Sequence, residues 1–387
     1  MSASGVTPGA PLLAGRPACN CVPWGDSLVA WGDNPAVGYR GTSWPVYASI
    51  LSGQRVNYQW NAGKQGDRTD QMIARFTTDV QPHSPNMVPI LAGTNDLVQS
   101  VPLATVTSNL ITMVKMVRSI GAVPVLCTLP PNNNTGNVTG LPAQIVALNS
   151  WIKRYTAAQG LVLVDFYTPL VDPANGHYLA AYFNDGTHPN NAGFVVMAQA
   201  FLAAVQSLLP AFLPALPADN VDANNLLADG LFLTDSNSDG VADSWQLLTG
   251  GGITPSLVTG DTTIQGNWQK GVTAAMGSSS SFFQQAISAI VPGHRYALTG
   301  KVKTSTITTP GALIVDCIFK TSGGTAISDF RPIDRLDQPI SAGIFYEETI
   351  APATAAIAQI FLQPQAGTGT YQFAQVGMYD LTAMGVL

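Results

Sequence analysis

Charged residues are scarce in this chain of 387 residues, at 10% of the total, against roughly 25% in an average soluble protein. Seventeen Lys and Arg against 23 Asp and Glu leave a formal net charge of −6. This balance argues against nucleic acid as a partner, because nucleic-acid-binding proteins present a basic face to phosphates. Hydrophobic residues still make up 46%, which is enough for a buried core in each of two domains.

Long hydrophobic runs are also missing. No uninterrupted apolar stretch reaches the roughly 18 residues that a membrane-spanning helix requires, so we expect no membrane insertion. The N-terminal residues 1–20 have no basic start and no apolar segment long enough for a signal peptide. The sequence as given therefore predicts no conventional secretory route.

Cysteine is the third shortage. Cys19, Cys21, Cys127 and Cys317 are too few and too scattered for a disulfide framework or a zinc site. We expect free thiols that are mostly buried. Cys19 and Cys21 could in principle hold a metal, but no histidine lies close to them in the sequence.

Short apolar runs alternate with helical patterns between residues 17 and 208, after an arm of small residues at 1–16 that we expect to be flexible. The runs lie at 18–24, 56–63, 86–93, 122–130 and 161–166, and the helical patterns at 67–80, 101–120, 141–159 and 191–209. Buried strands that alternate with helices predict an α/β domain at 17–208, with a parallel sheet covered on both faces.

A proline-rich linker follows at 209–224, where three prolines within eight residues prevent a helix from continuing. From 225 to 387 the pattern changes to alternation with period two, as in Leu313, Val315, Cys317 and Phe319. Such runs, separated by Gly, Ser and Thr turns, predict an antiparallel β-sandwich of jelly-roll type.

The first candidate for chemistry is Ser27, which follows the first predicted strand in the phrase Gly25-Asp26-Ser27. Ligand sites of open parallel sheets lie at the carboxyl ends of the strands, so Ser27 is placed where a nucleophile would be. The alternative is an ordinary serine that caps a helix.

Three further stretches favour the nucleophile. The turn after the second strand offers Gly63 and Gly66, where a backbone N–H can approach a reacting oxygen. Asn95 follows the third strand and carries a side-chain amide suited to stabilising an oxyanion. Asp185 and His188 precede the last helix, and an imidazole oriented by a carboxylate can remove the proton of a serine.

These four stretches, in this order, resemble the SGNH hydrolase superfamily, also called GDSL esterases. The resemblance covers about residues 17–208 and implies a flavodoxin-like three-layer α/β/α fold with a five-stranded parallel sheet. It implies Ser27 as nucleophile, His188 as base and Asp185 as its acidic partner. It also implies an oxyanion hole formed by Ser27, Gly66 and Asn95, with no cofactor needed for catalysis.

Three further side chains are candidates for binding substrate. Lys64 and Arg68 flank the oxyanion turn, and in a chain so poor in cations they are expected to face an anionic sugar. His177 precedes Asp185 by only eight residues and is a candidate for the rim of the active site.

The second domain contains one candidate metal site, a loop with oxygen side chains at alternate positions followed by glycine, as at the start of calcium loops. The expected ligands are Asp235, Asn237, Asp239, the backbone of Val241, and Asp243. We interpret the calcium ion as structural; the alternative is a solvated turn rich in Asx residues.

The β-pattern of residues 225–387 and the phrases around 225–245 and 376–385 also resemble C-terminal carbohydrate-binding-type jelly rolls of phage tail proteins. This resemblance implies an extracellular or virion-associated protein, since virions leave the cell by lysis and need no signal peptide. The implied partners are acetylated polysaccharide and, for assembly, further copies of the chain or other virion proteins. Trp245, Trp268 and Tyr346 are candidates for stacking on sugars, although such aromatic residues usually belong to the core.

Three functions are compatible with these patterns. The first is a carbohydrate O-acetylesterase that acts on acetylated bacterial surface polysaccharide through an acyl-enzyme. The second is a lipid or small-ester hydrolase, which would need a long apolar groove. The third is a non-catalytic glycan-binding module of a phage tail, against which the intact Ser27, Asp185 and His188 argue.

Overall fold

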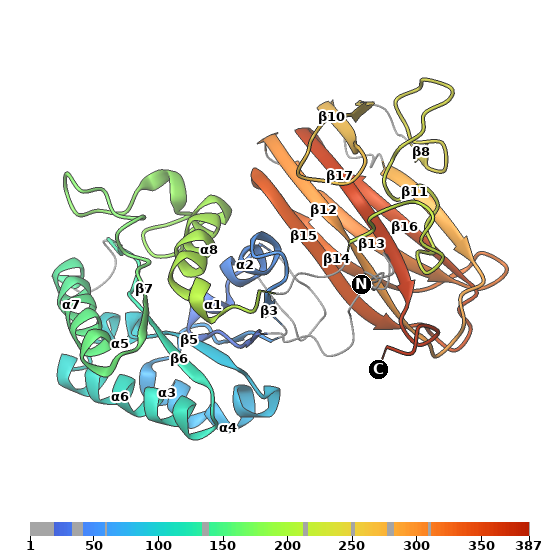
Figure 1. The fold of residues 1–387 in the computed structure, drawn as a ribbon. Helices are drawn as coiled ribbons and strands as arrows, with labels where there is room; N and C mark the ends of the chain where they lie inside the picture. Colours follow the sequence, from blue (N-terminus) through green and yellow to red (C-terminus); the bar gives the residue numbers. More distant parts are fainter. Residues whose placement is uncertain are drawn as a thin grey trace, which may run out of the picture. The chain divides into compact units, whose positions relative to one another are not determined.

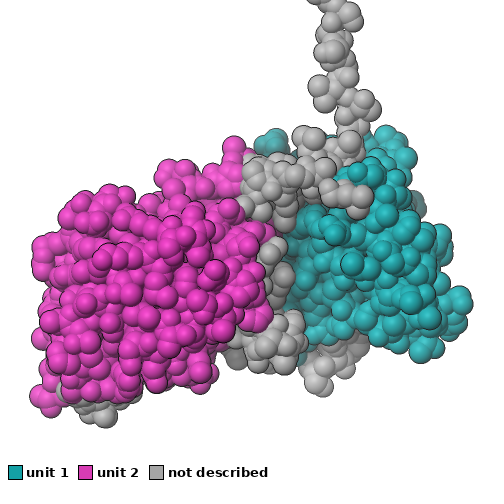
Figure 2. Space-filling model, turned by 90° about the horizontal axis from the view of Figure 1, so that it is seen from below, with its two compact units in different colours: residues 1–16, 212–387 teal, residues 17–211 magenta. Residues whose placement is uncertain are grey.

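The computed structural model describes residues 19–32, 42–58, 60–133, 139–211, 216–248, 252–276, 282–308 and 311–386. The predicted arm at 1–16 lies outside these residues. The chain divides into two compact units, one formed by Pro17–Ala211 and the other including Phe212–Leu387 (Figure 2).

The first unit is built on a fully parallel sheet (Figure 1). Its first two strand positions are each interrupted, so that β1 and β2 continue one another, as do β3 and β4. Across the sheet the order is β3/β4, β1/β2, β5, β6, β7, the flavodoxin-like order 2-1-3-4-5. The strands are β1 (Cys19–Cys21), β2 (Trp24–Gly25), β3 (Val56–Tyr58), β4 (Ala62–Gly63), β5 (Met87–Leu91), β6 (Val123–Cys127) and β7 (Val162–Val164).

Helices cover both faces of this sheet. On one face α2 packs against α8, and on the other α6 lies between α3 and α7 (Figure 1). The helices are α1 (Ser27–Ala30), α2 (Trp44–Leu51), α3 (Thr69–Ala74), α4 (Phe76–Asp79), α5 (Thr94–Val98), α6 (Leu103–Ser119), α7 (Leu141–Gln159) and α8 (Asn191–Val205). Short 3-10 turns lie at Gln81–His83, Ala180–Tyr182 and Gln206–Leu208.

The last helical stretch of this unit, Asn191–Leu208, is long and apolar enough to cross a membrane by length and composition alone. In the structure its apolar side chains have another use. Phe194, Met197, Phe201 and Val205 are fully buried, and the helix packs against α2 and β7. This is the ordinary arrangement of a core helix that covers a sheet.

The second unit consists of two five-stranded sheets in which every strand pair is antiparallel (Figure 1). One has the order β15-β12-β17-β10-β9 and the other β14-β13-β16-β11-β8. Its strands are β8 (Gln246–Leu248), β9 (Ile253–Val258), β10 (Trp268–Met276), β11 (Phe282–Ser288), β12 (Arg295–Thr308), β13 (Leu313–Lys320), β14 (Ala326–Leu336), β15 (Ile340–Ile350), β16 (Ile357–Pro364) and β17 (Gly367–Asp380).

The period-two pattern of β13 is confirmed, since Leu313, Val315, Cys317 and Phe319 are all buried on one face. The aromatic candidates for sugar stacking are buried as well. Trp245, Trp268 and Tyr346 are 4%, 1% and 5% exposed, so they belong to the core of this unit and offer no open ring face to a sugar.

Two predicted helical patterns differ in detail from the structure. The pattern at 67–80 predicts one helix, but the chain forms α3 and α4 with a break at Arg75. The helical pattern at 101–120 predicts one apolar face, and Val106, Leu110 and Val114 are buried on it, whereas Leu103 is 37% exposed. Leu103 is the first residue of the helix, where the chain has not yet turned fully onto the sheet.

Candidate active site

Ser27 stands where β2 ends and α1 begins. The helix cap is supplied by its neighbour: the Asp26 carboxylate accepts a hydrogen bond from Leu28 N–H at 2.9 Å. The alternative interpretation of Ser27 as an ordinary helix cap is therefore wrong. Its hydroxyl contacts His188 instead, with 2.9 Å between Ser27 Oγ and His188 Nε2.

The partner of Ser27 lies 161 residues further along the chain, in the loop before α8. Asp185 fixes His188 in two ways. Its Oδ2 lies 2.9 Å from His188 Nδ1, and its Oδ1 accepts the backbone N–H groups of His188 and Thr187 at 2.6 and 2.7 Å. The structure thus brings the predicted hydroxyl, imidazole and carboxylate into one hydrogen-bonded chain.

The Asp185 carboxylate is kept in its charged form. Partial burial alone would raise the pKa of Asp185, but the hydrogen bonds donated by His188 and Thr187 outweigh it and hold the pKa below its usual range. An ionised Asp185 accepts a hydrogen bond from His188 Nδ1–H, so the lone pair of Nε2 faces the serine hydroxyl. This arrangement suits proton transfer from Ser27 to His188.

Trp31 is a site residue that the sequence analysis missed. Its ring centroid lies 4.1 Å from that of the His188 imidazole, with the planes inclined at 33°. The backbone N–H of Trp31 donates to the Ser27 carbonyl at 2.9 Å. The missed signal is the spacing: Trp31 comes four residues after Ser27, which places both on one face of a helical turn.

The turn that carries Gly63 and Gly66 is tied to the nucleophile turn. Lys64 N–H donates to the Gly25 carbonyl at 3.1 Å, and Asn61 Nδ2 donates to the Val29 carbonyl at 2.9 Å.

The structure distinguishes the two glycines of this turn. Gly63 N–H is already bonded to Asn61 Oδ1 at 2.8 Å, and a Cβ at Gly63 would lie 2.4 Å from the backbone N of Ala30. Gly63 is therefore a close-packing glycine. Gly66 has φ +79°, is exposed, and has open space around it. Within the described residues neither Gly66 N–H nor Ser27 N–H donates a hydrogen bond, so both are free to bind an oxyanion.

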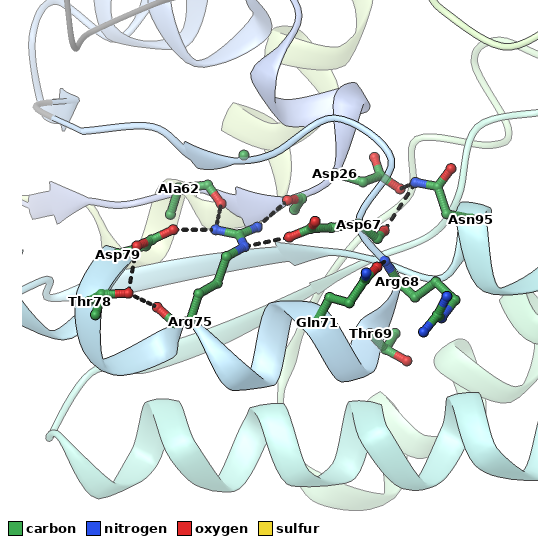
Figure 3. Close-up of polar contacts among 12 residues, drawn as sticks. Asp26, Ala62, Asp67, Arg68, Thr69, Gln71, Arg75, Thr78, Asp79 and Asn95 are labelled. Carbon is green, nitrogen blue, oxygen red and sulfur yellow. Dashed lines mark hydrogen bonds and ion pairs between the residues drawn. The ribbon is translucent and has the colours of Figure 1, made fainter.

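Asn95 stands at the start of α5 with both hydrogens of its amide engaged. Its Nδ2 lies 3.0 Å from the Asp67 carbonyl and 3.2 Å from Asp26 Oδ2 (Figure 3). Donation to an oxyanion requires Asn95 to share or release the longer of these contacts, the one with Asp26. The predicted role of Asn95 stays a prediction with that condition attached.

Asp26 is a buried acid next to the nucleophile. Burial, together with the nearby carboxylates of Asp96 and Asp67, raises its pKa to about 7 against the opposing hydrogen bond from Leu28 N–H. Asp96 is also fully buried and accepts both the N–H and the hydroxyl of Thr69, at 2.9 and 2.6 Å. It thereby anchors the start of α3.

Lys64 and Arg68, the two cationic side chains predicted to bind substrate, differ in their surroundings. Lys64 is exposed beside Gly66. Arg68 forms a bidentate pair with Asp70, with both N–O distances at 3.0 Å, and donates to Gln99 Oε1 at 2.7 Å. Since Asp70 neutralises the Arg68 charge locally, of these two cations only Lys64 is left to attract an anionic sugar.

His177 lies on an exposed hairpin between Val171 and Tyr178. This hairpin is joined to the His188 loop through Asn133, whose Oδ1 accepts Tyr178 N–H and whose own N–H donates to the Gly186 carbonyl, both at 3.1 Å. A place for His177 at the rim of the active site, and its contact with substrate, stay predictions.

The predicted calcium ligands are not arranged as a metal site. The Asp235 carboxylate accepts the N–H of Asp239 at 3.1 Å. The Asp239 carboxylate accepts the N–H of Val241 and the side-chain amide of Asn237, at 2.8 and 2.9 Å. Asp243 accepts from a serine earlier in the loop. No group of three His, Cys, Asp or Glu that could hold a metal ion occurs within the described ranges. Calcium binding stays a prediction that requires the loop to rearrange.

The four cysteines are free and buried, as predicted. Burial raises the pKa of the Cys19 thiol to about 11, and it raises the pKa of Cys127 still further. Thiols that stay protonated are poor metal ligands and poor nucleophiles.

The buried Asp26 makes stability depend on pH. The folded state keeps the proton up to about pH 7, whereas the unfolded chain releases it near 3.8. The stability that this group contributes is complete below pH 3.8 and is lost as the pH rises through 7. Wild type should lose up to roughly 1.4 kcal/mol per pH unit relative to Asp26→Asn across this window. Urea unfolding of both proteins at pH 5, 6, 7 and 8 measures the difference between their free energies of unfolding. A difference that does not change with pH contradicts the argument that Asp26 is buried with a raised pKa.

Comparison with known proteins agrees with this geometry. Residues 24–195 match the model of the GDSL-like lipase/acylhydrolase family. An arylesterase from Vibrio mimicus is 32% identical over 115 residues, which are 28% of this chain and 57% of the arylesterase, so the match spans little more than half of that relative.

Solved structures cover the same unit. A GDSL-like lipase from Bacteroides thetaiotaomicron is 23% identical, with 49% of this chain and 89% of that chain covered and a TM-score of 0.43. An acetylxylan esterase from Geobacillus stearothermophilus is 20% identical, with 48% and 93% covered and a TM-score of 0.42. By its family match and its site, the unit Pro17–Ala211 belongs to the SGNH superfamily of ester hydrolases, in its GDSL-like lipase/acylhydrolase family.

Proposed function

We propose that this protein is a serine esterase that removes O-acetyl groups from carbohydrate through an acyl-enzyme. The observation that carries the proposal is the chain of contacts from Ser27 Oγ to His188 Nε2 and from His188 Nδ1 to Asp185 Oδ2, each 2.9 Å long. A serine is a weak nucleophile until an adjacent base takes its proton, and this geometry supplies that base already oriented.

In the proposed reaction, Ser27 Oγ attacks the ester carbonyl while its proton passes to His188 Nε2. The negative oxygen of the tetrahedral intermediate accepts from the free N–H groups of Ser27 and Gly66, each donor lowering the barrier by roughly 3 kcal/mol. His188 then protonates the leaving alcohol. Water, activated by His188, then releases acetate from Ser27. Asp185 stabilises the imidazolium during both acylation and deacylation.

The surroundings of the site support a polar substrate. In the described part of the first unit, the exposed large hydrophobic residues are Leu103, Val123 and Val146. None of them lies on the loops that carry Ser27 and His188. The hairpin and the His188 loop are instead joined by amide and hydroxyl groups of Asn132, Asn133 and Thr187. Sugar hydroxyls bind to such groups, whereas a long acyl chain needs a continuous apolar groove.

We propose bacterial surface polysaccharide as the source of the acetylated sugar, and a virion as the setting, on the sequence resemblance of residues 225–387 to phage tail modules. The antiparallel sandwich is compatible with a glycan-binding role for this unit. The buried Trp245, Trp268 and Tyr346 leave that role to other residues.

Replacing the nucleophile tests the assignment first. Ser27→Ala should lower the hydrolysis of 4-nitrophenyl acetate to the background rate, because Ser27 Oγ is the hydroxyl that contacts His188 Nε2 among the residues that the structure describes. Ser108→Ala, an exposed serine of α6, is the matched control and should retain full activity. Both variants should melt at the wild-type temperature. Persistent turnover by Ser27→Ala means that the nucleophile is wrongly assigned.

Asp185→Asn should leave the fold intact and lower kcat by roughly 10³- to 10⁴-fold, with little change in KM. An amide at this position donates to His188 Nδ1, which moves the imidazole proton to Nε2 and removes the base. Asp172→Asn, in the turn before His177, is the control for a lost carboxylate. A decrease of kcat by less than tenfold in Asp185→Asn would show that the carboxylate does not orient the base.

The substrate class is tested by varying the length of the acyl chain and by supplying acetylated glycans. The protein should hydrolyse 4-nitrophenyl acetate at least about tenfold faster in kcat/KM than the octanoate, since an apolar groove is what rewards a longer chain. Mass spectrometry should detect acetate released from a panel of acetylated glycans. Preference for octanoate together with no release of acetate from any glycan overturns the carbohydrate assignment and favours a lipid ester.

A further inference from the structure

Arg75, between α3 and α4, carries a guanidinium whose side chain is only 11% exposed. Four acceptors surround it (Figure 3). Arg75 Nε lies 2.6 Å from Asp67 Oδ2, Nη2 lies 2.8 Å from the Gly25 carbonyl, and Nη1 lies 2.7 Å from the Ala62 carbonyl and 3.0 Å from Asp79 Oδ2.

Three of these acceptors belong to the segments that carry the oxyanion donors. Gly25 precedes Ser27 by two residues at the end of β2. Ala62 and Asp67 enclose the turn that contains Gly66. Asp67 reaches further, because its backbone carbonyl accepts Asn95 Nδ2 at 3.0 Å. One guanidinium therefore connects the origins of all three predicted donors.

Only arginine can fill this position. The carbonyls of Gly25 and Ala62 stand at the ends of β2 and β4, where the sheet gives way to the two active-site turns. Arginine offers five N–H donors in a rigid planar fork, so it can bind two carbonyls and two carboxylates from fixed directions at once. Lysine would bring the same charge on a single flexible ammonium.

We infer that Arg75 is the positioning residue of the oxyanion hole: it locks the nucleophile turn, the Gly66 turn and, through Asp67, the Asn95 amide at fixed separations. The inference rests on the ester hydrolysis proposed above. Arg75 touches no reacting atom. Its effect should appear in the transition state, because displacing preorganised donors by a fraction of an ångström weakens their hold on the oxyanion more than the binding of the uncharged ester.

The experiment compares Arg75→Lys with wild type and with Arg118→Lys, an exposed arginine of α6 whose guanidinium makes a long contact of 3.4 Å with the Gln159 carbonyl. The kcat and KM for 4-nitrophenyl acetate are measured with the inhibition constant of a trifluoromethyl ketone, which forms a tetrahedral adduct with the serine. Arg75→Lys should lower kcat by about 10- to 100-fold with KM within about threefold. The inhibition constant should rise by a similar factor. Arg118→Lys should match wild type.

A second pair of variants covers the case in which Arg75→Lys does not fold. Asp67→Asn and Asp79→Asn each remove one ion pair of Arg75, but of the two only Asp67 lies beside Gly66 in its turn and accepts from Asn95. Asp67→Asn should reduce kcat and raise the inhibition constant of the ketone, whereas Asp79→Asn should change the melting temperature alone. Equal effects of the two would assign Arg75 a purely structural role.

The outcomes separate this inference from the proposed function. If the wild-type protein hydrolyses no ester, the proposed function fails. If it hydrolyses the acetate and folded Arg75→Lys keeps wild-type kcat and ketone inhibition, the positioning role alone is overturned.

Discussion

The hydrogen bond between Ser27 Oγ and His188 Nε2 is the contact on which the account depends. It joins two loops 161 residues apart in the sequence, and it can form only because β2 and the segment before α8 reach the same edge of a parallel sheet. Every other feature of the site serves this contact: Asp185 sets the tautomer of the imidazole, and Trp31 packs against its ring.

The oxyanion side of the site is held by buried charge, although the chain has few charges to use. Arg75 pairs with Asp67, and Asp96 anchors Thr69, while Asp26 remains a buried acid whose pKa is raised to about 7. Burying such groups is costly unless each one is hydrogen-bonded. Their position beside the turns of Ser27 and Gly66 fits the inferred role of Arg75, because catalysis by preorganised donors requires backbone N–H groups held in place.

The fold and the reacting groups could be predicted from the sequence because both follow from local patterns. The alternation of apolar runs and helices predicts the parallel sheet, and the residues after each strand must meet at one edge. The resemblance already favours Gly66 over Gly63, and the coordinates supply the physical reason, since the Asn61 side chain occupies Gly63 N–H. Arg75 and Trp31 went unrecognised because their roles come from contacts and from no motif. The calcium loop illustrates a different limit: its spacing matches a motif, its carboxylates accept backbone N–H groups of the same loop, and calcium binding there stays a prediction.

The central claim is that His188 activates Ser27, and chemical labelling tests it most directly. A fluorophosphonate should react with one site per chain, and mass spectrometry of the digested protein should place the label on Ser27. The same reagent should leave Ser27 unlabelled in His188→Ala, because the hydroxyl then has no base. Labelling at another residue, or labelling of Ser27 at an equal rate without His188, would contradict the account.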